Sequence, residues 1–257
     1  MDYNVVHEYT GKEAGRKQSG CPQGGKMNIH GFNKSTLLDY PGHLAATIFV
    51  GGCNLRCPFC HNASLVLRPY TQPVIPLEEV LSYLEKRRGI LEGVCITGGE
   101  PTLYANLPAF AAIIKDLGYK VKLDTNGTNP AMIKDLAEKK LIDYVAMDIK
   151  NSREKYAVTA GNKDISLNDI DESISLLLSG IVEYEFRTTV TKELHTENDM
   201  HSIGQWINGA RAYYLQAYAD SGDIISPGFS APSKEVLESY KALLSDYAEH
   251  VEIRGVY

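Results

Sequence analysis

Short apolar runs rich in β-branched residues alternate along the chain with longer stretches whose apolar residues recur at helical spacing. Runs of the first kind favour buried strands, and stretches of the second kind favour amphipathic helices. Several helical stretches begin at Pro, Asn or Ser, as helices often do. The pattern predicts strands at 45–50, 93–97, 121–125, 144–149, 183–190 and 212–218, and helices at 77–88, 107–117, 130–139, 167–178, 198–208 and 233–250.

This alternation predicts a parallel sheet with right-handed crossovers, either open and doubly wound or rolled into a barrel. Polar or ligand-type residues stand at the carboxyl end of every predicted strand, and α/β folds build their sites at that edge. We therefore predict an α/β fold, a partial (β/α)6 TIM-like barrel with one working mouth. The strand-end residues are 53–60, 98–101, 124–127 and 148–150, with Arg187 and Gln216.

Composition places the chain among globular proteins. With 257 residues, 44% hydrophobic and 23% charged, it fits a single domain, which we assign to residues 28–257. Residues 1–27 are polar and Gly-rich, and we expect a disordered leader or a start codon placed upstream of the true one. A net charge of −6 with scattered basic residues argues against nucleic acid as a partner. No apolar stretch suits a membrane helix, so we expect a cytoplasmic protein without membrane contact.

The cysteines suggest metal chemistry. Three of the five, Cys53, Cys57 and Cys60, are crowded together just after the first predicted strand. An odd number of cysteines with this spacing fits metal binding in a reducing compartment better than a disulfide framework. Cys95 lies in an apolar run and is expected to be a small buried hydrophobe, whereas Cys21 lies in the leader and is expected to be incidental.

Three thiols in this spacing are compatible with two kinds of metal site, a zinc ion or an iron–sulfur cluster. A structural zinc site takes four protein ligands, so zinc would need a fourth from Cys95 or His61, although His61 adjoins Cys60 and adjacent side chains do not easily reach one small ion. An iron–sulfur cluster held by three cysteines instead leaves one iron open to a further ligand. Zinc would favour a non-catalytic binding module, and a cluster would favour an enzyme.

The triad resembles the CxxxCxxC signature of radical S-adenosylmethionine (SAM) enzymes, and residues 98–101 resemble their GGEP element. The resemblance implies a fold of the radical SAM type and a 4Fe–4S cluster on Cys53, Cys57 and Cys60, with SAM on the fourth iron. It also implies that the GGEP element lines the methionine part of SAM. Two glycines allow a close backbone approach, while Glu100 has the alternative role of stabilising the turn.

Two further elements resemble a narrower group, the activating enzymes of glycyl-radical proteins: DTNG at 124–127 and DxK at 148–150. The resemblance implies that Asp148 and Lys150 orient the ribose and carboxylate of SAM. Residues two apart on a strand point to one side, so both would face the barrel interior while Ile149 packs outward; the alternative is a strand-end ion pair. The implied SAM-binding residues are Gly98, Gly99, Glu100, Asp124, Asn126, Asp148, Lys150 and Arg187.

Other residues complete the predicted site. Arg187 offers bidentate donors to the carboxylate of SAM or to an approaching peptide. His61 and Asn62 follow the triad, as in the same family, and we expect them behind the cluster ligands rather than on the iron. Residues 39–42, Asp-Tyr-Pro-Gly, resemble an element before the first strand of these activases, and we expect them to shape the mouth.

From Asn28 onward the chain is similar to the longer form of the activating proteins of anaerobic ribonucleoside-triphosphate reductases, a match carried by 38–42, 121–127 and 144–150. This implies a radical SAM oxidoreductase (EC 1.97.1 type) that cleaves SAM to methionine and a 5′-deoxyadenosyl radical, which takes hydrogen from a glycine of the reductase. A flavodoxin or ferredoxin would donate the electron. No cysteine follows Cys95, so one cluster is expected. The alternatives are activation of another glycyl-radical enzyme, such as pyruvate formate-lyase, and radical chemistry on a small molecule.

Overall fold

A single eight-stranded sheet organises the protein. The structure, a computed structural model, describes residues 27–255 of the chain. The expectation for the leader therefore lies outside the described residues, except at Met27, which is buried in the core. The strands are β1 (Ile29–Thr36), β2 (Ala45–Val50), β3 (Gly93–Gly98), β4 (Lys120–Thr125), β5 (Tyr144–Asp148), β6 (Glu183–Val190), β7 (Tyr213–Ala217) and β8 (Val251–Arg254).

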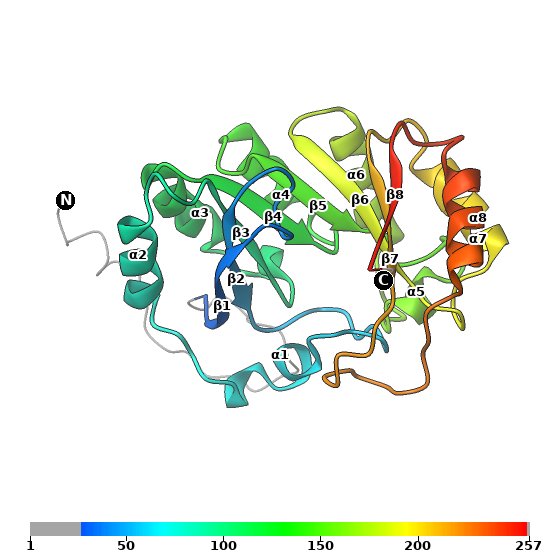
Figure 1. The fold of residues 1–257 in the computed structure, drawn as a ribbon, viewed down its shortest axis with the longest axis horizontal. Coiled ribbons are helices and arrows are strands. Elements are labelled where there is room, and N and C mark those ends of the chain that lie inside the picture. Colours follow the sequence, from blue (N-terminus) through cyan, green and yellow to red (C-terminus); the bar gives the residue numbers. More distant parts are fainter. Residues whose placement is uncertain (1–26, 256–257) are drawn as a thin grey trace.

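The strands lie in the order of the sequence, and β2 to β8 are all parallel. The predicted partial barrel is confirmed, and its six predicted strands are β2 to β7. Two edge strands were missed: β1, which pairs antiparallel with β2, and the short β8 beside β7. No ladder joins β1 to β8 within residues 27–255, so the sheet curves without closing (Figure 1).

Helices follow most of the strands. They are α1 (Ala63–Leu67), η3 (Pro69–Thr71), α2 (Leu77–Lys86), η4 (Pro101–Leu103), α3 (Leu107–Asp116), α4 (Pro130–Glu138), α5 (Tyr156–Thr159), α6 (Leu167–Leu178), α7 (Glu197–Trp206) and α8 (Lys234–Leu244). The six predicted helices are α2, α3, α4, α6, α7 and α8. The predicted helix 233–250 was too long, because the chain leaves α8 after Leu244 to enter β8.

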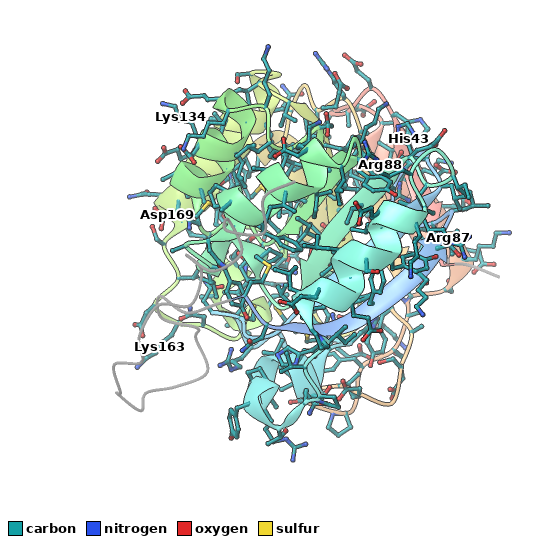
Figure 2. All side chains as sticks on the ribbon, turned by 90° about the vertical axis from the view of Figure 1, so that its left-hand side faces the viewer. His43, Arg87, Arg88, Lys134, Lys163 and Asp169 are labelled. Atoms are coloured by element: carbon teal, nitrogen blue, oxygen red, sulfur yellow. The ribbon has the colours of Figure 1, made fainter. Side chains whose placement is uncertain are left out.

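The longer helices cover one face of the sheet and leave the other face for the site. In Figure 1, α2 and α3 flank the amino-terminal half, α7 and α8 flank β8, and α1 lies apart on the open side, near the orange chain after β7. Charged side chains of the outer helices and loops, among them Arg87, Lys134 and Lys163, are exposed and project from the surface (Figure 2). The longer helices and their charged side chains therefore lie on the outside of the curved sheet.

Residues 39–42 lie at the opposite end of the sheet from the cysteine loop. They precede the amino end of β2, where the Thr47 hydroxyl donates to Oδ2 of Asp39 at 2.5 Å. The buried Tyr40 ring packs against His43 and against Tyr144 at the start of β5, with centroid distances of 4.8 and 5.9 Å. The prediction that this segment shapes the mouth is wrong, because it packs against the strand beginnings instead.

Candidate active site

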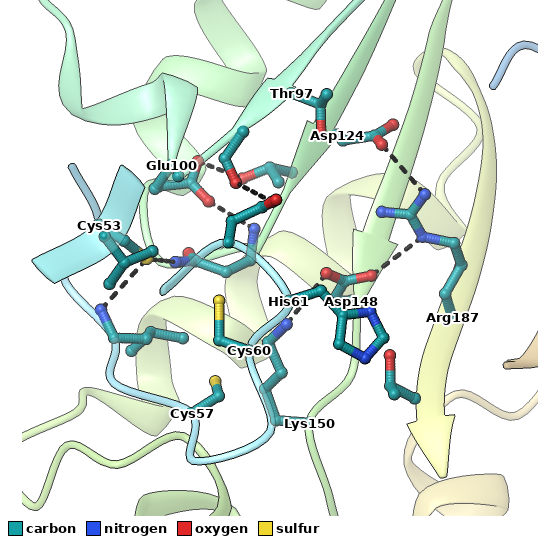
Figure 3. A pocket seen from close by; sticks show the side chains of 18 of the residues that line it. Cys53, Cys57, Cys60, His61, Thr97, Glu100, Asp124, Asp148, Lys150 and Arg187 are labelled. Carbon is teal, nitrogen blue, oxygen red and sulfur yellow. Dashed lines mark hydrogen bonds and ion pairs between the residues drawn. The ribbon is translucent and has the colours of Figure 1, made fainter. Parts of the chain in front are cut away.

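A cavity of about 250 Å³ opens at the carboxyl ends of the parallel strands. Its walls come from the loop after β2, the turn after β3 and the ends of β4 to β7, so segments distant in sequence meet there (Figure 3). All the sequence-predicted site residues line it. The lining consists of Cys53, Leu55, Cys57, Phe59, Cys60, His61, Asn62, Val66, Thr97, Gly98, Gly99, Glu100, Asp124, Thr125, Asn126, Asp148, Lys150, Arg187, Thr189 and Gln216.

The cysteine loop is supported from one side by the segment after β5. The Arg56 amide donates to the Ala160 carbonyl at 2.9 Å, and the Asn162 side chain donates to the Asn54 carbonyl at 3.2 Å. Gly161 has a φ of +61°, and a Cβ there would overlap the Arg56 carbonyl. Only glycine fits that position, so α5 and the turn after it fix the shape of the loop.

A second segment, the chain after β7, holds the other side of the loop. The Ser64 hydroxyl donates to Oδ2 of Asp223 at 2.6 Å, and the Ser226 amide donates to the Pro58 carbonyl at 2.8 Å. The Phe229 ring meets the Phe59 ring edge to face at 6.2 Å. Neither supporting segment was predictable from the sequence, because hydrogen bonds between distant loops leave no periodic signal.

Burial is the main influence on the three thiols. It raises the pKa of Cys53 to about 12 and that of Cys57 to about 11, and it raises the pKa of Cys60 as well. A buried thiolate needs a positive partner, and bound iron would supply that charge. The Leu55 amide also donates to Sγ of Cys53 at 3.3 Å, the kind of contact that tunes cluster thiolates.

The three thiols of the cysteine loop share one cavity, and Cys95 lies outside it. Cys53, Cys57 and Cys60 line one cavity, yet within residues 27–255 no group of three or more His, Cys, Asp or Glu side chains is arranged to hold one metal ion. Cys95 does not line the cavity; it is buried on β3, with Sγ donating to Oδ1 of Asp124 at 3.6 Å. Cys95 therefore cannot serve as the fourth zinc ligand without rearrangement, and its surroundings are more polar than expected.

The two glycines after β3 are required by a neighbouring backbone. The Gly99 amide donates to the Val50 carbonyl at 2.7 Å, and the Glu100 amide donates to the Gly52 carbonyl at 2.8 Å. A Cβ on Gly99 would overlap that Gly52 carbonyl, and Gly98 has a φ of +117°. The two glycines were expected to allow close approach of a ligand. In the structure they let the turn after β3 lie directly on the start of the cysteine loop.

Glu100 joins the ends of β3 and β4. Its buried carboxylate accepts hydrogen bonds from the amide and hydroxyl of Thr102, from the Thr125 hydroxyl at 2.8 Å and from the Asn126 amide at 2.7 Å. Burial outweighs these donors and raises the carboxyl pKa. The alternative that Glu100 stabilises the turn therefore has direct structural support.

Asn126 connects this turn to the cysteine loop. Its amide nitrogen donates to Oδ1 of Asn54 at 2.9 Å and to Sγ of Cys53 at 3.7 Å, while its oxygen accepts from the Thr128 amide and hydroxyl. Asn54 in turn donates to the Thr128 hydroxyl at 2.8 Å. On the opposite wall, Asn62 donates to the Gly98 carbonyl at 3.0 Å. These contacts hold the cysteine loop against the turn after β3 and the end of β4.

Five charged residues form a continuous chain of ion pairs beneath the cavity. Lys122 pairs with Oδ1 of Asp124, whose Oδ2 accepts from Nη1 of Arg187 at 3.1 Å. Nε of Arg187 donates to Oδ1 of Asp148 at 2.9 Å, and Oδ2 of Asp148 accepts from Lys150 at 3.0 Å (Figure 3). Both carboxylates are thus saturated by cations. Asp148 and Lys150 face the cavity together, while Ile149 is buried elsewhere.

The cations keep this chain charged despite its burial. Burial alone would raise the pKa of Asp124, but Arg187 and Lys122 hold it down at about 2. The same balance lowers the pKa of Asp148, where Arg187 and Lys150 offset burial. Conversely, the carboxylates raise the pKa of Lys122, Lys150 and Arg187 above their ordinary values although burial acts the other way. All five groups are therefore ionised near neutral pH.

Two polar residues line the far wall of the cavity. No sequence signal indicated Thr189, and Gln216 was noted only for its position at a strand end. Thr189 and Gln216 are partners in register on β6 and β7, so their side chains point to the same face. Both line the cavity, and neither side chain makes a hydrogen bond with any residue in 27–255. The His61 ring lies near this wall, 5.3 Å from the Tyr218 ring, and its pKa is lowered by burial.

A half-barrel with three thiols converging at its carboxyl mouth defines an enzyme scaffold for an iron–sulfur cluster. Residues 47–199 match the radical SAM superfamily model, so the chain belongs to that superfamily. It is 31% identical over 238 residues to a protein of Methanocaldococcus jannaschii named as a glycyl-radical enzyme activating enzyme, covering 90% of this chain and 97% of the relative. It is 28% identical over 229 residues to the 7-carboxy-7-deazaguanine synthase of Thermococcus kodakarensis, covering 81% and 82%.

Solved structures share the fold. The crystal structure of Streptococcus suis SuiB bound to S-adenosylmethionine aligns with a TM-score of 0.62 at 16% identity, covering 80% of this chain and 48% of SuiB. Family membership assigns a 4Fe–4S cluster and SAM as cofactors of this chain, and it sets aside the zinc alternative. In the part of the chain that the structure describes, no helix has the length and apolar character needed to span a membrane.

Proposed function

We propose that this protein activates a glycyl-radical enzyme, and that the partner is an anaerobic ribonucleoside-triphosphate reductase. The observation that carries the proposal is the convergence, in one cavity, of the three-cysteine loop with Arg187 and Lys150 of the ion-pair chain. The relative named as an activating enzyme, which matches nearly the whole length of both chains, supports the class. The similarity of 38–42, 121–127 and 144–150 to reductase activases supports the partner.

The cofactors would occupy the side of the cavity formed by the cysteine loop and the turn after β3, where side chains and backbone are joined by many hydrogen bonds. Cys53, Cys57 and Cys60 would hold the cluster. When bound, the cluster would supply one electron, received from a flavodoxin or ferredoxin, for cleavage of a carbon–sulfur bond of SAM to methionine and a 5′-deoxyadenosyl radical, and that radical would take a hydrogen atom from the partner's glycine.

The chain's own residues would bind and orient SAM. Arg187 uses Nε and one Nη1 hydrogen for the two aspartates, so its remaining N–H groups are available to a carboxylate from the cavity. Lys150, held by Asp148, places a second positive charge on the same wall. Leu55, Phe59 and Val66 supply apolar surface that excludes water from the reacting atoms.

A second candidate function is radical chemistry on a small molecule. The similarity to a 7-carboxy-7-deazaguanine synthase over four-fifths of both chains favours it. In that case Thr189 and Gln216 would bind polar groups of the small molecule rather than of a peptide. Both candidates share SAM cleavage and differ only in the hydrogen donor.

Anaerobic reconstitution tests the proposal. The loaded protein is reduced with dithionite and given SAM, with or without anaerobic ribonucleoside-triphosphate reductase; 5′-deoxyadenosine and the glycyl-radical resonance signal are measured. We expect a radical on the reductase in step with 5′-deoxyadenosine. Radical formation only on pyruvate formate-lyase would correct the partner, and cleavage of SAM without a radical on either enzyme would favour the small-molecule candidate. The Cys57→Ala protein, which lacks one proposed cluster ligand, is the negative control.

A further inference from the structure

One charged residue of the ion-pair chain is farther from the cavity than the rest. Lys122, on β4, is 2% exposed and does not line the cavity, whereas the other four members of the chain do. Its ammonium group pairs with Oδ1 of Asp124 and lies 3.8 Å from Sγ of Cys95. Burying a lysine side chain is costly unless it is paired, and this one serves no ligand directly.

The position of Lys122 determines how Asp124 meets Arg187. A carboxylate facing a guanidinium ordinarily accepts two parallel hydrogen bonds. Here Lys122 occupies Oδ1, so Asp124 offers only Oδ2, at 3.1 Å from Nη1 of Arg187. Nε of Arg187 is thereby left for Oδ1 of Asp148 at 2.9 Å. The guanidinium bridges two strands, β4 and β5, from its own place on β6.

Charge gives the same answer as geometry. Lys122, Arg187 and Lys150 provide three cations against the carboxylates of Asp124 and Asp148. Without Lys122 the chain would hold two cations and two carboxylates, and Oδ1 of Asp124 would lose its cation. Arg187 would then be drawn to pair with both oxygens of Asp124. The four members that line the cavity carry two cations and two carboxylates, so the one surplus positive charge of the chain is that of Lys122, behind them.

We propose that Lys122 is a positioning residue for the SAM site: by occupying Oδ1 of Asp124, it keeps Arg187 shared between Asp124 and Asp148, with free N–H groups directed to an anionic group in the cavity. The inference rests on the proposed function only in taking the carboxylate of SAM as that anionic group. It does not depend on which partner receives the radical.

The test compares Lys122→Met with Lys122→Arg in cluster-loaded protein. SAM binding is measured by titration calorimetry, and kcat and KM are measured from 5′-deoxyadenosine formation. We expect Lys122→Met to weaken SAM binding about tenfold, the effect of one charged hydrogen bond, with kcat at saturating SAM reduced less than about threefold. Lys122→Arg should restore binding to within about threefold, because it keeps the charge next to Asp124.

A crystal structure of Lys122→Met gives a second readout. In that structure the Arg187 guanidinium should donate to both carboxylate oxygens of Asp124, and Asp148 should pair with Lys150 alone. The matched control is Lys115→Met, which removes a lysine paired with Asp143 at 2.7 Å on a partly exposed site away from the cavity. It should leave SAM binding unchanged. If Lys122→Met does not fold, Lys122→Gln, whose amide can still donate to Asp124, should fold with an intermediate affinity.

Several outcomes would overturn the inference. They are unchanged SAM affinity in folded Lys122→Met or Lys122→Gln, an equal loss in Lys115→Met, and an unmoved Arg187 in the crystal structure. Wild-type protein that binds and cleaves SAM but activates no glycyl-radical enzyme would refute the proposed function and leave this inference standing. Wild-type protein that does not bind SAM would refute both.

Discussion

The two sides of the cavity differ in how fully their polar groups are engaged. On the side of the cysteine loop, Glu100 accepts four hydrogen bonds, and Asn126 ties the loop to the end of β4. On the side of β6 and β7, the Thr189 hydroxyl and the Gln216 amide have no hydrogen-bond partner within residues 27–255. The polar groups of the first side are hydrogen bonded to the protein, whereas those of Thr189 and Gln216 are half-buried and open to the cavity.

This difference suggests a division of work. Preorganised groups suit a cofactor that must sit in one geometry, because no reorganisation is needed when it binds. Groups that lack protein partners gain most from a ligand that supplies them, since unsatisfied polar groups at a closed site are costly. The ion-pair chain connects the two sides, with Arg187 on β6 reaching Asp124 on β4. Changes on the first side should therefore affect the cluster and SAM, and changes on the second should affect the hydrogen donor.

The largest effect is expected on the engaged side, at the cluster ligands. Cys57→Ala should abolish both the cluster and SAM cleavage, since two thiols cannot replace the three-cysteine set. Iron content and 5′-deoxyadenosine yield are the measurements. Cys95→Ala is the control, because this buried thiol lies outside the cavity, and it should retain nearly the full iron content. Loss of the cluster in that control would refute the ligand assignment.

Gly99→Ala should be the next most damaging change. The added methyl group would overlap the Gly52 carbonyl, and two backbone segments hydrogen bonded to each other cannot separate cheaply. We expect a loss of about 3 kcal/mol in unfolding free energy, measured by chemical denaturation. Gly42→Ala is matched to it: φ there is +75° with open space around the new methyl group, so only the backbone cost of roughly 1 kcal/mol applies. Equal losses in the two variants would show that packing between the β3 turn and the loop is unimportant.

Substitutions on the unengaged side should separate SAM cleavage from radical transfer. Gln216→Leu should lower the glycyl-radical yield about tenfold, the effect of roughly one hydrogen bond to the partner's loop, and Thr189→Val should act in the same direction. SAM cleavage without partner should change less than about twofold. The readouts are the radical signal per 5′-deoxyadenosine formed and the KM for SAM. A raised KM for SAM with unaltered coupling would instead place this wall under the cofactor and erase the division between the two sides.

Much of the fold was predictable from the sequence because its signals are local. Apolar periodicity placed β2, β6 and α6 at their observed bounds, and Ser166 caps α6 as a helix start should. β1 was missed because Gly31, Asn33 and Lys34 weaken its strand pattern, and β8 because it has only four residues. Edge strands depend on pairing with a neighbour, which a single-sequence pattern does not report.

The site was predictable in its residues but not in its supports. Strand-end position and motif resemblance identified the lining from Cys53 to Arg187. Neither signal could identify Ala160 or Asp223, which hold the cysteine loop through contacts more than 100 residues apart in sequence. Nor could they reveal Lys122, because a lysine in a strand is ordinarily exposed and only the three-dimensional pairing with Asp124 explains its burial.

The smallest expected effect is on the pH dependence of stability, and it differs between two buried carboxylates, Asp124 of the ion-pair chain and Glu100 of the turn after β3. Asp124 is held by cations, so its pKa in the folded protein is about 2 against an ordinary value of 3.8. Its stabilising contribution, roughly 2 kcal/mol, is complete above the unfolded pKa and is lost as the pH falls through the folded pKa. Glu100 is held by neutral donors, and burial raises its pKa above 4.5. The folded state therefore binds this proton more tightly, and ionisation of Glu100 lowers stability as the pH rises.

Asp124→Asn and Glu100→Gln should consequently show opposite pH trends. The unfolding free energy is measured by denaturation between pH 3.5 and pH 8, and each variant is compared with the wild-type protein. The deficit of Asp124→Asn should shrink as the pH falls below about 4. The deficit of Glu100→Gln should shrink instead as the pH rises, because the variant avoids the ionisation that the wild-type protein undergoes in a buried place. Parallel trends would mean that the cations of the ion-pair chain do not reach Asp124 as the geometry indicates.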